Sequence, residues 1–350
     1  MAARNHLMLT HFYNTPYTLL GSEWNIPGFI GSSFGTGPNS SISPVDSNYV
    51  YFAATMVLDS PRRTYIRTWR SIDGGLTFTF RSEWQVAEMF PDLFPVVIAD
   101  PSVRDTVHII LHKGDYASGD RGWWRSTDGC GSFSHTATFS PVTGYEMGPL
   151  LWGVSICLSD SSYAAYYNED DSTIYVSSDN AQTFSAAAVQ AGLYSIHIKA
   201  NDHLECFAAQ NAVNGIVYHS SDFFSTLGSV SVGAEAPDYG VFQSLSDGKV
   251  ICIGINSGGT DIWIWNGTTF DCYQEVFGRS GEGLHFFWIA VSKNKNDFYV
   301  VFGLPARREI WRSEDGIEWH EVFCQPVPQN IWGITIGDAS ILAGYMSEVT

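Results

Sequence analysis

The stretch that decides the fold is Gly122-Trp-Trp-Arg-Ser126-Thr-Asp128-Gly129-Cys-Gly-Ser132-Phe133. It starts with β-forming residues, continues with a Ser-x-Asp-Gly sequence and ends on an aromatic residue. The Asp side chain in such a sequence can accept hydrogen bonds from turn amides, and glycine can adopt a positive φ. The stretch therefore predicts a β-hairpin whose turn begins at Ser126 and contains Asp128.

This pattern recurs along the chain, so a repeat organises the sequence. Three further strong copies are Thr64-Tyr-Ile-Arg-Thr-Trp-Arg-Ser71-Ile-Asp73-Gly74-Gly75-Leu-Thr77-Phe78, Ile174-Tyr-Val-Ser177-Ser-Asp179-Asn180-Ala-Gln-Thr183-Phe184 and Ile310-Trp-Arg-Ser313-Glu-Asp315-Gly316-Ile-Glu-Trp319. Two weaker copies are Val217-Tyr-His-Ser220-Ser-Asp222-Phe-Phe-Ser-Thr226-Leu227 and Ile262-Trp-Ile-Trp265-Asn266-Gly267-Thr-Thr-Phe270. The closing hydrophobic residues follow one another at intervals of 43 to 55 residues, which is the period of a propeller or a solenoid.

Each period also has room for two further strands. In the third repeat these are expected at 152–158 and 163–167, where β-rich segments occur. Helical periodicity of useful length is missing from the sequence. The chain is therefore predicted to be all-β, with four strands in each propeller blade.

The two ends of the chain are expected to complete one blade together. Segments 331–336 and 340–345 read as its inner strands, and 6–12 and 17–20 read as its outer strands. Such pairing would close the ring without a free sheet edge. We therefore expect a single propeller over residues 1–350, with seven blades and with six or eight as alternatives. Its expected parts are closing strands in 1–25, six blades in about 38–325, and the inner strands of the closing blade in 326–350.

Composition excludes several classes of partner. The formal net charge is −18, and the chain lacks the basic patch expected of a nucleic-acid-binding protein. An apolar stretch long enough to span a membrane is also missing, and the first residues do not read as a signal peptide, so a cytoplasmic or virion location is expected. The six cysteines show no metal-ligand spacing and are expected to be buried thiols. Neither a metal site nor a cofactor is predicted.

The repeated turns resemble the Asp box, Ser/Thr-x-Asp-x-Gly-x-x-Trp/Phe, of the sialidase-like propeller superfamily, also called BNR repeats. In that superfamily the boxes lie at the outer rim of the face opposite the ligand, so the resemblance implies a structural role for them here. The residues concerned are Ser71, Asp73, Ser126, Asp128, Ser177, Asp179, Ser220, Asp222, Ser313 and Asp315.

The resemblance places a ligand at the other face, where the innermost strands begin. Aromatic residues occur repeatedly at these starts: Phe94, Trp152, Tyr194, Tyr239, Trp288 and Trp332. They either pack between blades or form a stacking platform for sugar rings. Arginines Arg62, Arg121 and Arg307 are expected in loops on the same face, with several acids.

A sialidase would need three convergent arginines, a Tyr-Glu nucleophile pair and an acid/base Asp. The Arg-Ile-Pro signature of that family is replaced here by Asn25-Ile26-Pro27. We therefore assign no catalytic residue and expect a non-catalytic binding or scaffolding propeller, with carbohydrate as the leading ligand and a phage or virus particle as a possible setting. The alternatives are a glycoside hydrolase with a diverged site, and an assembly factor that binds protein, similar to the single-propeller proteins that help build photosystem II.

Overall fold

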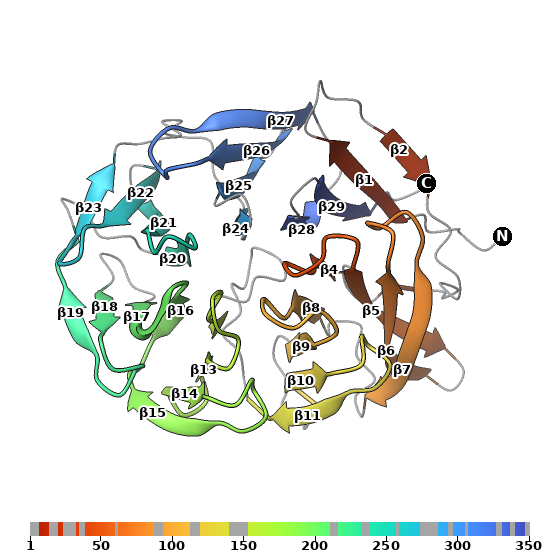
Figure 1. Ribbon diagram of the computed structural model, residues 1–350, viewed down its shortest axis with the longest axis horizontal. Coiled ribbons are helices and arrows are strands. Elements are labelled where there is room, and N and C mark those ends of the chain that lie inside the picture. Colours follow the sequence, from red (N-terminus) through yellow and green to blue (C-terminus); the bar gives the residue numbers. More distant parts are fainter. Residues whose placement is uncertain are drawn as a thin grey trace. The chain divides into compact units, whose positions relative to one another are not determined.

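The computed structural model describes residues 7–13, 20–23, 33–34, 39–59, 62–86, 94–112, 120–139, 153–210, 216–232, 239–256, 259–273, 286–292, 297–304, 307–326, 331–336 and 340–346. Every regular element within these residues is a β-strand, so the all-β prediction is confirmed. The described strands form seven antiparallel sheets, six of four strands and one of five (Figure 1). In this part of the chain we find no helix with the length and apolarity needed to cross a membrane.

The chain divides into two compact units, which we describe separately. The first comprises Met1–Thr138, Gly144–Leu150 and Pro326–Thr350, and the second comprises Phe139–Thr143 and Leu151–Gln325. Three sheets belong to the first unit. Their strands are β1 (Leu7–Tyr13), β2 (Leu20–Glu23), β28 (Ile331–Ile336) and β29 (Ser340–Met346); β3 (Ser33–Phe34), β4 (Asn39–Ile42), β5 (Val50–Asp59), β6 (Arg62–Ser71) and β7 (Thr79–Val86); and β8 (Phe94–Ala99), β9 (Val107–His112), β10 (Gly122–Ser126) and β11 (Ser134–Ala137).

The second unit holds the other four sheets, each built from four consecutive strands. These are β12 (Val154–Ile156), β13 (Ala164–Asn168), β14 (Thr173–Ser177) and β15 (Ser185–Val189); β16 (Leu193–Lys199), β17 (Asp202–Gln210), β18 (Val217–Ser220) and β19 (Gly228–Val230); β20 (Tyr239–Ser244), β21 (Val250–Asn256), β22 (Gly259–Trp265) and β23 (Phe270–Tyr273); and β24 (Phe286–Ser292), β25 (Asp297–Leu304), β26 (Arg307–Ser313) and β27 (His320–Pro326).

Strands from the two ends of the chain share one sheet, as predicted. The order is β2-β1-β29-β28, and β1 pairs with β29 from Leu7↔Met346 to Tyr13↔Ser340. The outermost strand was predicted at 17–20, but β2 starts only at Leu20; residues 14–19 lie outside the described part. Pairing with β1 sets this position, because His11 lies opposite Leu20, and β-propensity alone does not determine register.

Middle strands are buried on both faces, which explains their nearly continuous apolar sequences. In β5, Tyr51 and Ala53 pack with Ile109 of the neighbouring sheet, whereas Phe52 and Ala54 belong to a second cluster on the opposite face. The second unit shows the same arrangement, where one core cluster joins residues of the sheets β16–β19 and β20–β23. Neighbouring sheets in a unit are therefore held together face to face by hydrophobic packing.

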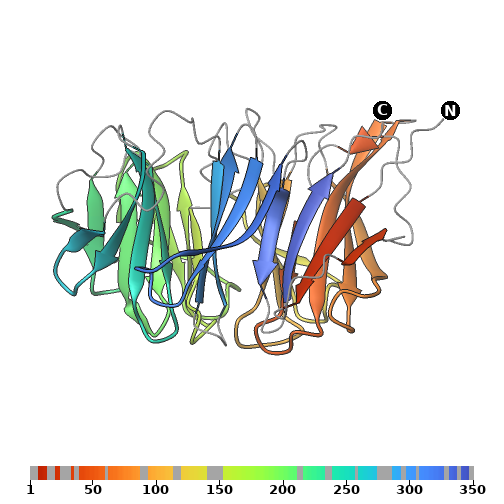
Figure 2. The same cartoon turned by 90° about the horizontal axis from the view of Figure 1, so that it is seen from above.

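Each sheet has two ends with different connections (Figure 2). Because the strands are antiparallel and consecutive, the turn from the first to the second strand and the turn from the third to the fourth lie at the same end. We call this the turn end, and the opposite end the loop end. The Ser-x-Asp sequences occupy the turn end, and the first strands begin at the loop end.

The prediction of buried thiols is right for Cys130, Cys157, Cys206 and Cys252 and wrong for Cys272, which is exposed. Cys272 lies in β23, the outermost strand of its sheet, where no described strand covers it. The side chain of Cys324 is outside the described part.

Candidate functional site

The turn between β10 and β11 shows how a Ser-x-Asp sequence shapes the turn end. The Ser126 hydroxyl donates to Asp128 Oδ1 at 2.8 Å and accepts from the amide of Cys130 at 3.0 Å. The Asp128 carboxylate also accepts from the amides of Gly131 and Ser132, at 2.8 and 2.9 Å, and from the Ser132 hydroxyl at 2.8 Å. The two side chains thus satisfy the turn amides from inside the turn.

Three other turns repeat this geometry, including one of the two weaker copies. Their serine–aspartate hydrogen bonds are 2.6 to 2.8 Å long, and in each a threonine hydroxyl donates to the second aspartate oxygen: Ser71–Asp73–Thr77, Ser177–Asp179–Thr183 and Ser220–Asp222–Thr226.

Two turns depart from this hydrogen-bond geometry. The turn at Ser313 is one residue tighter, because its hydroxyl accepts from Gly316, three residues on, instead of from the fourth; Asp315 accepts from the amides of Ile317 and Glu318. In the copy that lost Ser and Asp, Asn266 accepts from the amides of Thr268 and Thr269, both at 2.9 Å. Asparagine therefore takes over the role of the Ser-Asp pair there.

The sequence suggested that glycine supplies the positive φ in these turns, and this holds for only some of them. The residue two positions after the aspartate is left-handed in four turns, yet it is Cys130, Ala181 or Phe224 in three of those and Gly75 in one. These three side chains are buried. Packing of the side chain into the core therefore compensates for the strain of the left-handed backbone.

Hydrogen bonding keeps the turn aspartates ionised. Partial burial acts to raise the pKa of Asp128, but hydrogen bonds from Ser126, Gly131 and Ser132 outweigh it and lower that pKa. The same balance holds for Asp179, whose pKa falls to about 2, and the pKa values of the remaining turn aspartates are lowered as well: Asp73, Asp222 and Asp315. A carboxylate that stays ionised in this way stabilises its turn and is a poor general acid near neutral pH.

Four of these turns also contact the first hairpin of their own sheet. The amide of the residue after the aspartate donates to a carbonyl oxygen of that hairpin: Gly74 to Asn48, Gly129 to Asp105, Asn180 to Ser162 and Phe223 to Leu204, at 2.8 to 3.1 Å. The first hairpins carry an aspartate turn of their own, which sequence reasoning missed. Asp46, Asp160 and Asp247 each accept from the amide two residues later.

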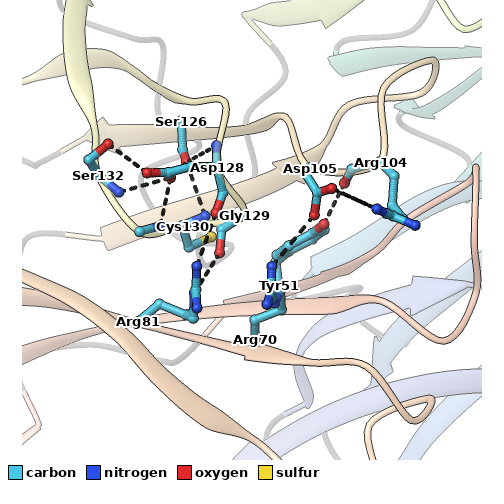
Figure 3. A network of polar contacts seen from close by, with 11 residues as sticks. Tyr51, Arg70, Arg81, Arg104, Asp105, Ser126, Asp128, Gly129, Cys130 and Ser132 are labelled. Atoms are coloured by element: carbon cyan, nitrogen blue, oxygen red, sulfur yellow. Dashed lines mark hydrogen bonds and ion pairs between the residues drawn. The ribbon is translucent and has the colours of Figure 1, made fainter.

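Polar contacts join the sheets β3–β7 and β8–β11 within the first unit (Figure 3). Arg81 of β7 donates to the carbonyl oxygens of Gly129 and Asp128, both at 3.1 Å. Tyr51 donates its hydroxyl hydrogen to the carbonyl oxygen of Arg104. The turn end of one sheet is thus fixed to strands of the next.

Two arginines that directly precede turn serines form ion pairs with acids distant in sequence. Arg70 lies 3.5 Å from the Asp105 carboxylate, and Arg312 lies 2.8 Å from Asp297. Sequence spacing could not show these pairings, because the acids come from other strands or turns.

The loop end holds the aromatic residues proposed as ligand contacts. Phe94 and Tyr239 are the first residues of β8 and β20, Trp288 is the third of β24 and Trp332 the second of β28. Trp152 lies outside the described residues. Tyr194, the second residue of β16, is only 3 % exposed, so its ring packs in the interior.

A β-bulge occurs at two of these aromatic residues. In β16 the register shifts between Leu193 and Ser195, so Tyr194 has no residue opposite it in β17. In β28 it shifts between Ile331 and Gly333, so Trp332 is the extra residue relative to β29. A bulge re-aims the side chain of the inserted residue and is common next to binding sites.

Several first strands lie side by side in each unit. In the second unit β16 contacts β20, and β20 contacts β24, which places Tyr194, Tyr239 and Trp288 on neighbouring strands. In the first unit β4 contacts both β28 and β8, so one strand separates the strands of Trp332 and Phe94.

The three arginines expected in loops have equivalent places at the starts of third strands. Arg62 and Arg307 are the first residues of β6 and β26, and Arg121 directly precedes β10. Arg121 is half-buried, and its carbonyl oxygen lies 3.2 Å from Nε2 of His135. Glu309, two residues after Arg307, is buried and accepts from Nε1 of Trp311 at 2.9 Å.

Two histidines of the described part have structural partners. Trp123 Nε1 donates to Nδ1 of buried His108 at 3.0 Å, so the ring hydrogen is on Nε2, which lies 3.2 Å from Asp100. Nε2 of His197 lies 2.7 Å from the Ser244 hydroxyl. A cluster of metal-ligating side chains was not found among the described residues. Sequence reasoning missed the Asp100–His108–Trp123 chain, for which the sequence gives no spacing signal.

Comparison with known proteins identifies the fold. No protein-family model matches the sequence, and no curated protein matches it. Among solved structures, the chain resembles YCF48 bound to a D1 peptide, with a TM-score of 0.54, 16 % identity, and coverage of 93 % of this chain and 95 % of that one. It also resembles a protein from Lactobacillus plantarum, with a TM-score of 0.54, 12 % identity, and coverage of 99 % and 100 %. YCF48 from Cyanidioschyzon merolae gives a TM-score of 0.50, 14 % identity, and coverage of 89 % and 95 %. These structures are β-propellers, and this chain has the β-propeller fold.

Proposed function

We propose that this chain is a non-catalytic binding propeller of the sialidase-like Asp-box type, and that it binds carbohydrate at the loop end. The observation that carries the proposal is the placement of aromatic residues at the beginnings of neighbouring first strands, with Trp332 at a bulge. Tryptophan and tyrosine offer a flat apolar face together with a hydrogen-bonding group, which suits the mixed surface of a sugar ring. Tyr194 is buried and supports the fold in this account.

The Asp-box assignment is supported by the shared hydrogen bonds of the Ser-x-Asp turns. In four turns the serine, the aspartate and a hydroxyl residue four positions after the aspartate make the same contacts. A turn stabilised in this way needs no ligand, which favours a structural role for the boxes and leaves the loop end for binding.

A second candidate is the binding of a protein segment. It is favoured by the similarity over nearly the whole chain to YCF48, whose structure was solved with a D1 peptide. In this reading the chain is an assembly factor or a part of a larger particle, and the first-strand aromatics hold peptide side chains. Incorporation into a phage or virus particle, and a cytoplasmic or virion location, belong to the same proposal.

The enzymatic alternative is a glycoside hydrolase with a diverged site. Catalysis of that kind needs an acid/base carboxyl group, whose pKa is best raised toward neutral pH. The turn aspartates, with their lowered pKa values, fit a structural role better.

Three probes applied to the full chain separate these functions. A glycan array, an array of overlapping peptides, and a panel of fluorogenic glycosides each report one of them. We expect signal on the glycan array and no glycoside turnover. Peptide binding with a silent glycan array would replace the carbohydrate proposal by the second candidate, and turnover would replace it by the third.

A further inference from the structure

A cluster of partly buried polar side chains joins the sheets β16–β19 and β20–β23 within the second unit. Glu205 of β17 is at its centre: Oε2 accepts from Nζ of Lys199, and Oε1 accepts from Nε1 of Trp265 at 2.8 Å. His219 of β18 faces the same carboxylate, with Nε2 3.5 Å from Oε1. Because Trp265 belongs to β22, Glu205 connects the two sheets. We call Lys199, Glu205, His219 and Trp265 the Glu205 cluster.

The repeats of this chain show that His219 occupies a position that arginine holds elsewhere. The residue directly before the turn serine is an arginine in three sheets, a valine in a fourth and a histidine in this one: Arg70, Arg125, Arg312, Val176 and His219. The fold therefore accepts a permanent cation at this position, and only this sheet has a group there that titrates near neutral pH.

Glu205 has an equivalent in the sheet β24–β27. The residue opposite the turn serine is preceded by Asp297 in that sheet and by Glu205 in this one. Nε of Arg312 donates to Oδ2 of Asp297 at 2.8 Å. The contact between His219 and Glu205 therefore stands where another sheet has a permanent ion pair, and its own charge depends on pH.

Neutral His219 leaves a polar atom unsatisfied. Its Nε2 is buried and makes no hydrogen bond within the described part of the chain, and such an atom costs free energy. The side chain as a whole is 25 % exposed, so protons from solvent reach the ring. A carboxylate oxygen accepts more than one hydrogen bond, so Oε1 of Glu205 can accept from His219 as well as from Trp265.

The surroundings of His219 favour a charged ring. Glu205 supplies a negative charge, and the Trp265 ring lies 5.0 Å away between centroids, within the range of a cation–π interaction. Lys199 opposes protonation, but it contacts the other oxygen of the carboxylate. Among the described residues, the charged side chains on the surrounding elements are Lys199 of β16, Glu205 of β17 and Asp222 of the turn after β18, while β19 places Gly228 opposite His219.

We propose that the Glu205 cluster is a pH-dependent link between the sheets β16–β19 and β20–β23. When the pH falls into the range where histidine takes up a proton, Nε2 of His219 donates to Oε1 of Glu205, and the charged ring lies against Trp265 of the other sheet. The unfolded chain lacks both contacts. The stabilisation by this link is therefore present at acid pH and is lost as the pH rises out of that range.

The indole N–H resonance of Trp265, assigned with Trp265→Phe, reports on this link in the full chain. We expect it to shift as the pH falls from 8 to 5 in the wild type, because the oxygen that accepts this bond gains a second donor, and to stay constant in His219→Gln. The matched control is the Trp311 resonance. Trp311 also donates to a glutamate, Glu309, at 2.9 Å, in the sheet where Arg312 takes the place of His219. It should stay constant in both proteins.

Thermal melts of His219→Arg and His219→Gln measure the contribution to stability. His219→Arg should melt at a higher temperature than the wild type at pH 8, and this difference should shrink at pH 5, whereas His219→Gln should fall further below the wild type at pH 5 than at pH 8. Comparing proteins at one pH removes the opposite effect of buried His108 and His197, which all of them share.

Two results would overturn the proposal. One is a Trp265 resonance that stays constant in the wild type or shifts equally in folded His219→Gln. The other is a difference in melting temperature between His219→Arg and the wild type that is the same at pH 8 and at pH 5.

Discussion

Arg81 Nε of β7 donates to the carbonyl oxygen of Gly129 at 3.1 Å, and so joins one sheet to the Ser-x-Asp turn of the next. The turn residue that receives this bond also has a positive φ of 66°. The arginine thus holds a left-handed backbone segment in place from a neighbouring sheet, and this Ser-x-Asp turn stabilises a contact between sheets as well as its own hairpin.

Arg81→Ala should therefore lower the free energy of unfolding by about 1–3 kcal/mol, because charge-assisted hydrogen bonds to Gly129 and Asp128 are lost. Urea denaturation measures this change. Arg67→Ala serves as the control: it breaks a partly exposed ion pair with Glu83 one strand away and should cost only about 0–1 kcal/mol. Equal losses of unfolding free energy in the two variants would show that the contact between sheets contributes no more than a partly exposed ion pair.

Asp128→Ala tests the structural role of the Ser-x-Asp turn. The variant loses bonds from Gly131 and Ser132 and should be destabilised by about 1–2 kcal/mol, with ligand binding unchanged. Thermal melts together with binding assays give both quantities. Loss of binding in a folded Asp128→Ala protein would indicate that the functional site lies at the turn end.

Two glycines with positive φ should respond very differently to alanine. A Cβ at Gly122 would lie 2.0 Å from the carbonyl oxygen of Ala137, whereas a Cβ at Gly267 meets no atom within 4 Å. Gly267→Ala should cost about 1–2 kcal/mol of backbone strain, and Gly122→Ala about 3 kcal/mol or more because β10 and β11 must also separate. Chemical denaturation ranks the two variants, and an equal cost would contradict the tight approach of these strands.

Acid should destabilise the protein before the turn aspartates titrate. Burial lowers the pKa of His197 to about 3; the amide of Ala200 donates to Ser244 Oγ, which leaves the Ser244 hydroxyl hydrogen for His197 Nε2. Because the unfolded chain binds the proton near pH 6.5, this contribution is complete above pH 6.5 and is lost as the pH falls toward 3, by up to about 1.4 kcal/mol per pH unit.

His108 acts in the same direction, because burial lowers its pKa despite the hydrogen bond to Asp100. Urea denaturation from pH 7 to pH 5 should show the loss, and His197→Gln should make it less steep. A free energy of unfolding that stays constant over this range in the wild-type chain would refute the assignment of a buried neutral histidine.

The sequence predicts those parts of the fold that depend on short-range interactions. The hairpins at Ser71 and Ser126 follow from short-range hydrogen bonding, and the shared sheet of the two chain ends follows from the need to cover sheet edges. The left-handed Phe224 was not predictable in this way, because its strain is compensated by the burial of its side chain in the folded protein.

Long-range partners also escaped the sequence analysis. The acid that faces Arg70 is Asp105, which is supplied by another sheet, and the register of β2 depends on its pairing with β1. For the candidate site, the aromatic residues at the strand starts could be found from the pattern, but the bulge at Trp332 and the burial of Tyr194 depend on the pairing of whole strands.

Binding of the wild-type chain and of three tryptophan variants to one glycan array tests the carbohydrate proposal most directly. The variants are Trp288→Ala and Trp332→Ala at the loop end, and Trp319→Ala, which lies in the turn at the other end of the sheet that contains Trp288. We predict that the first two lose at least about tenfold in affinity, as expected for a buried aromatic anchor at a binding hot spot, and that Trp319→Ala binds as the wild type does. Equal glycan binding per folded molecule in all four proteins, or no glycan bound by the wild type, would contradict the account.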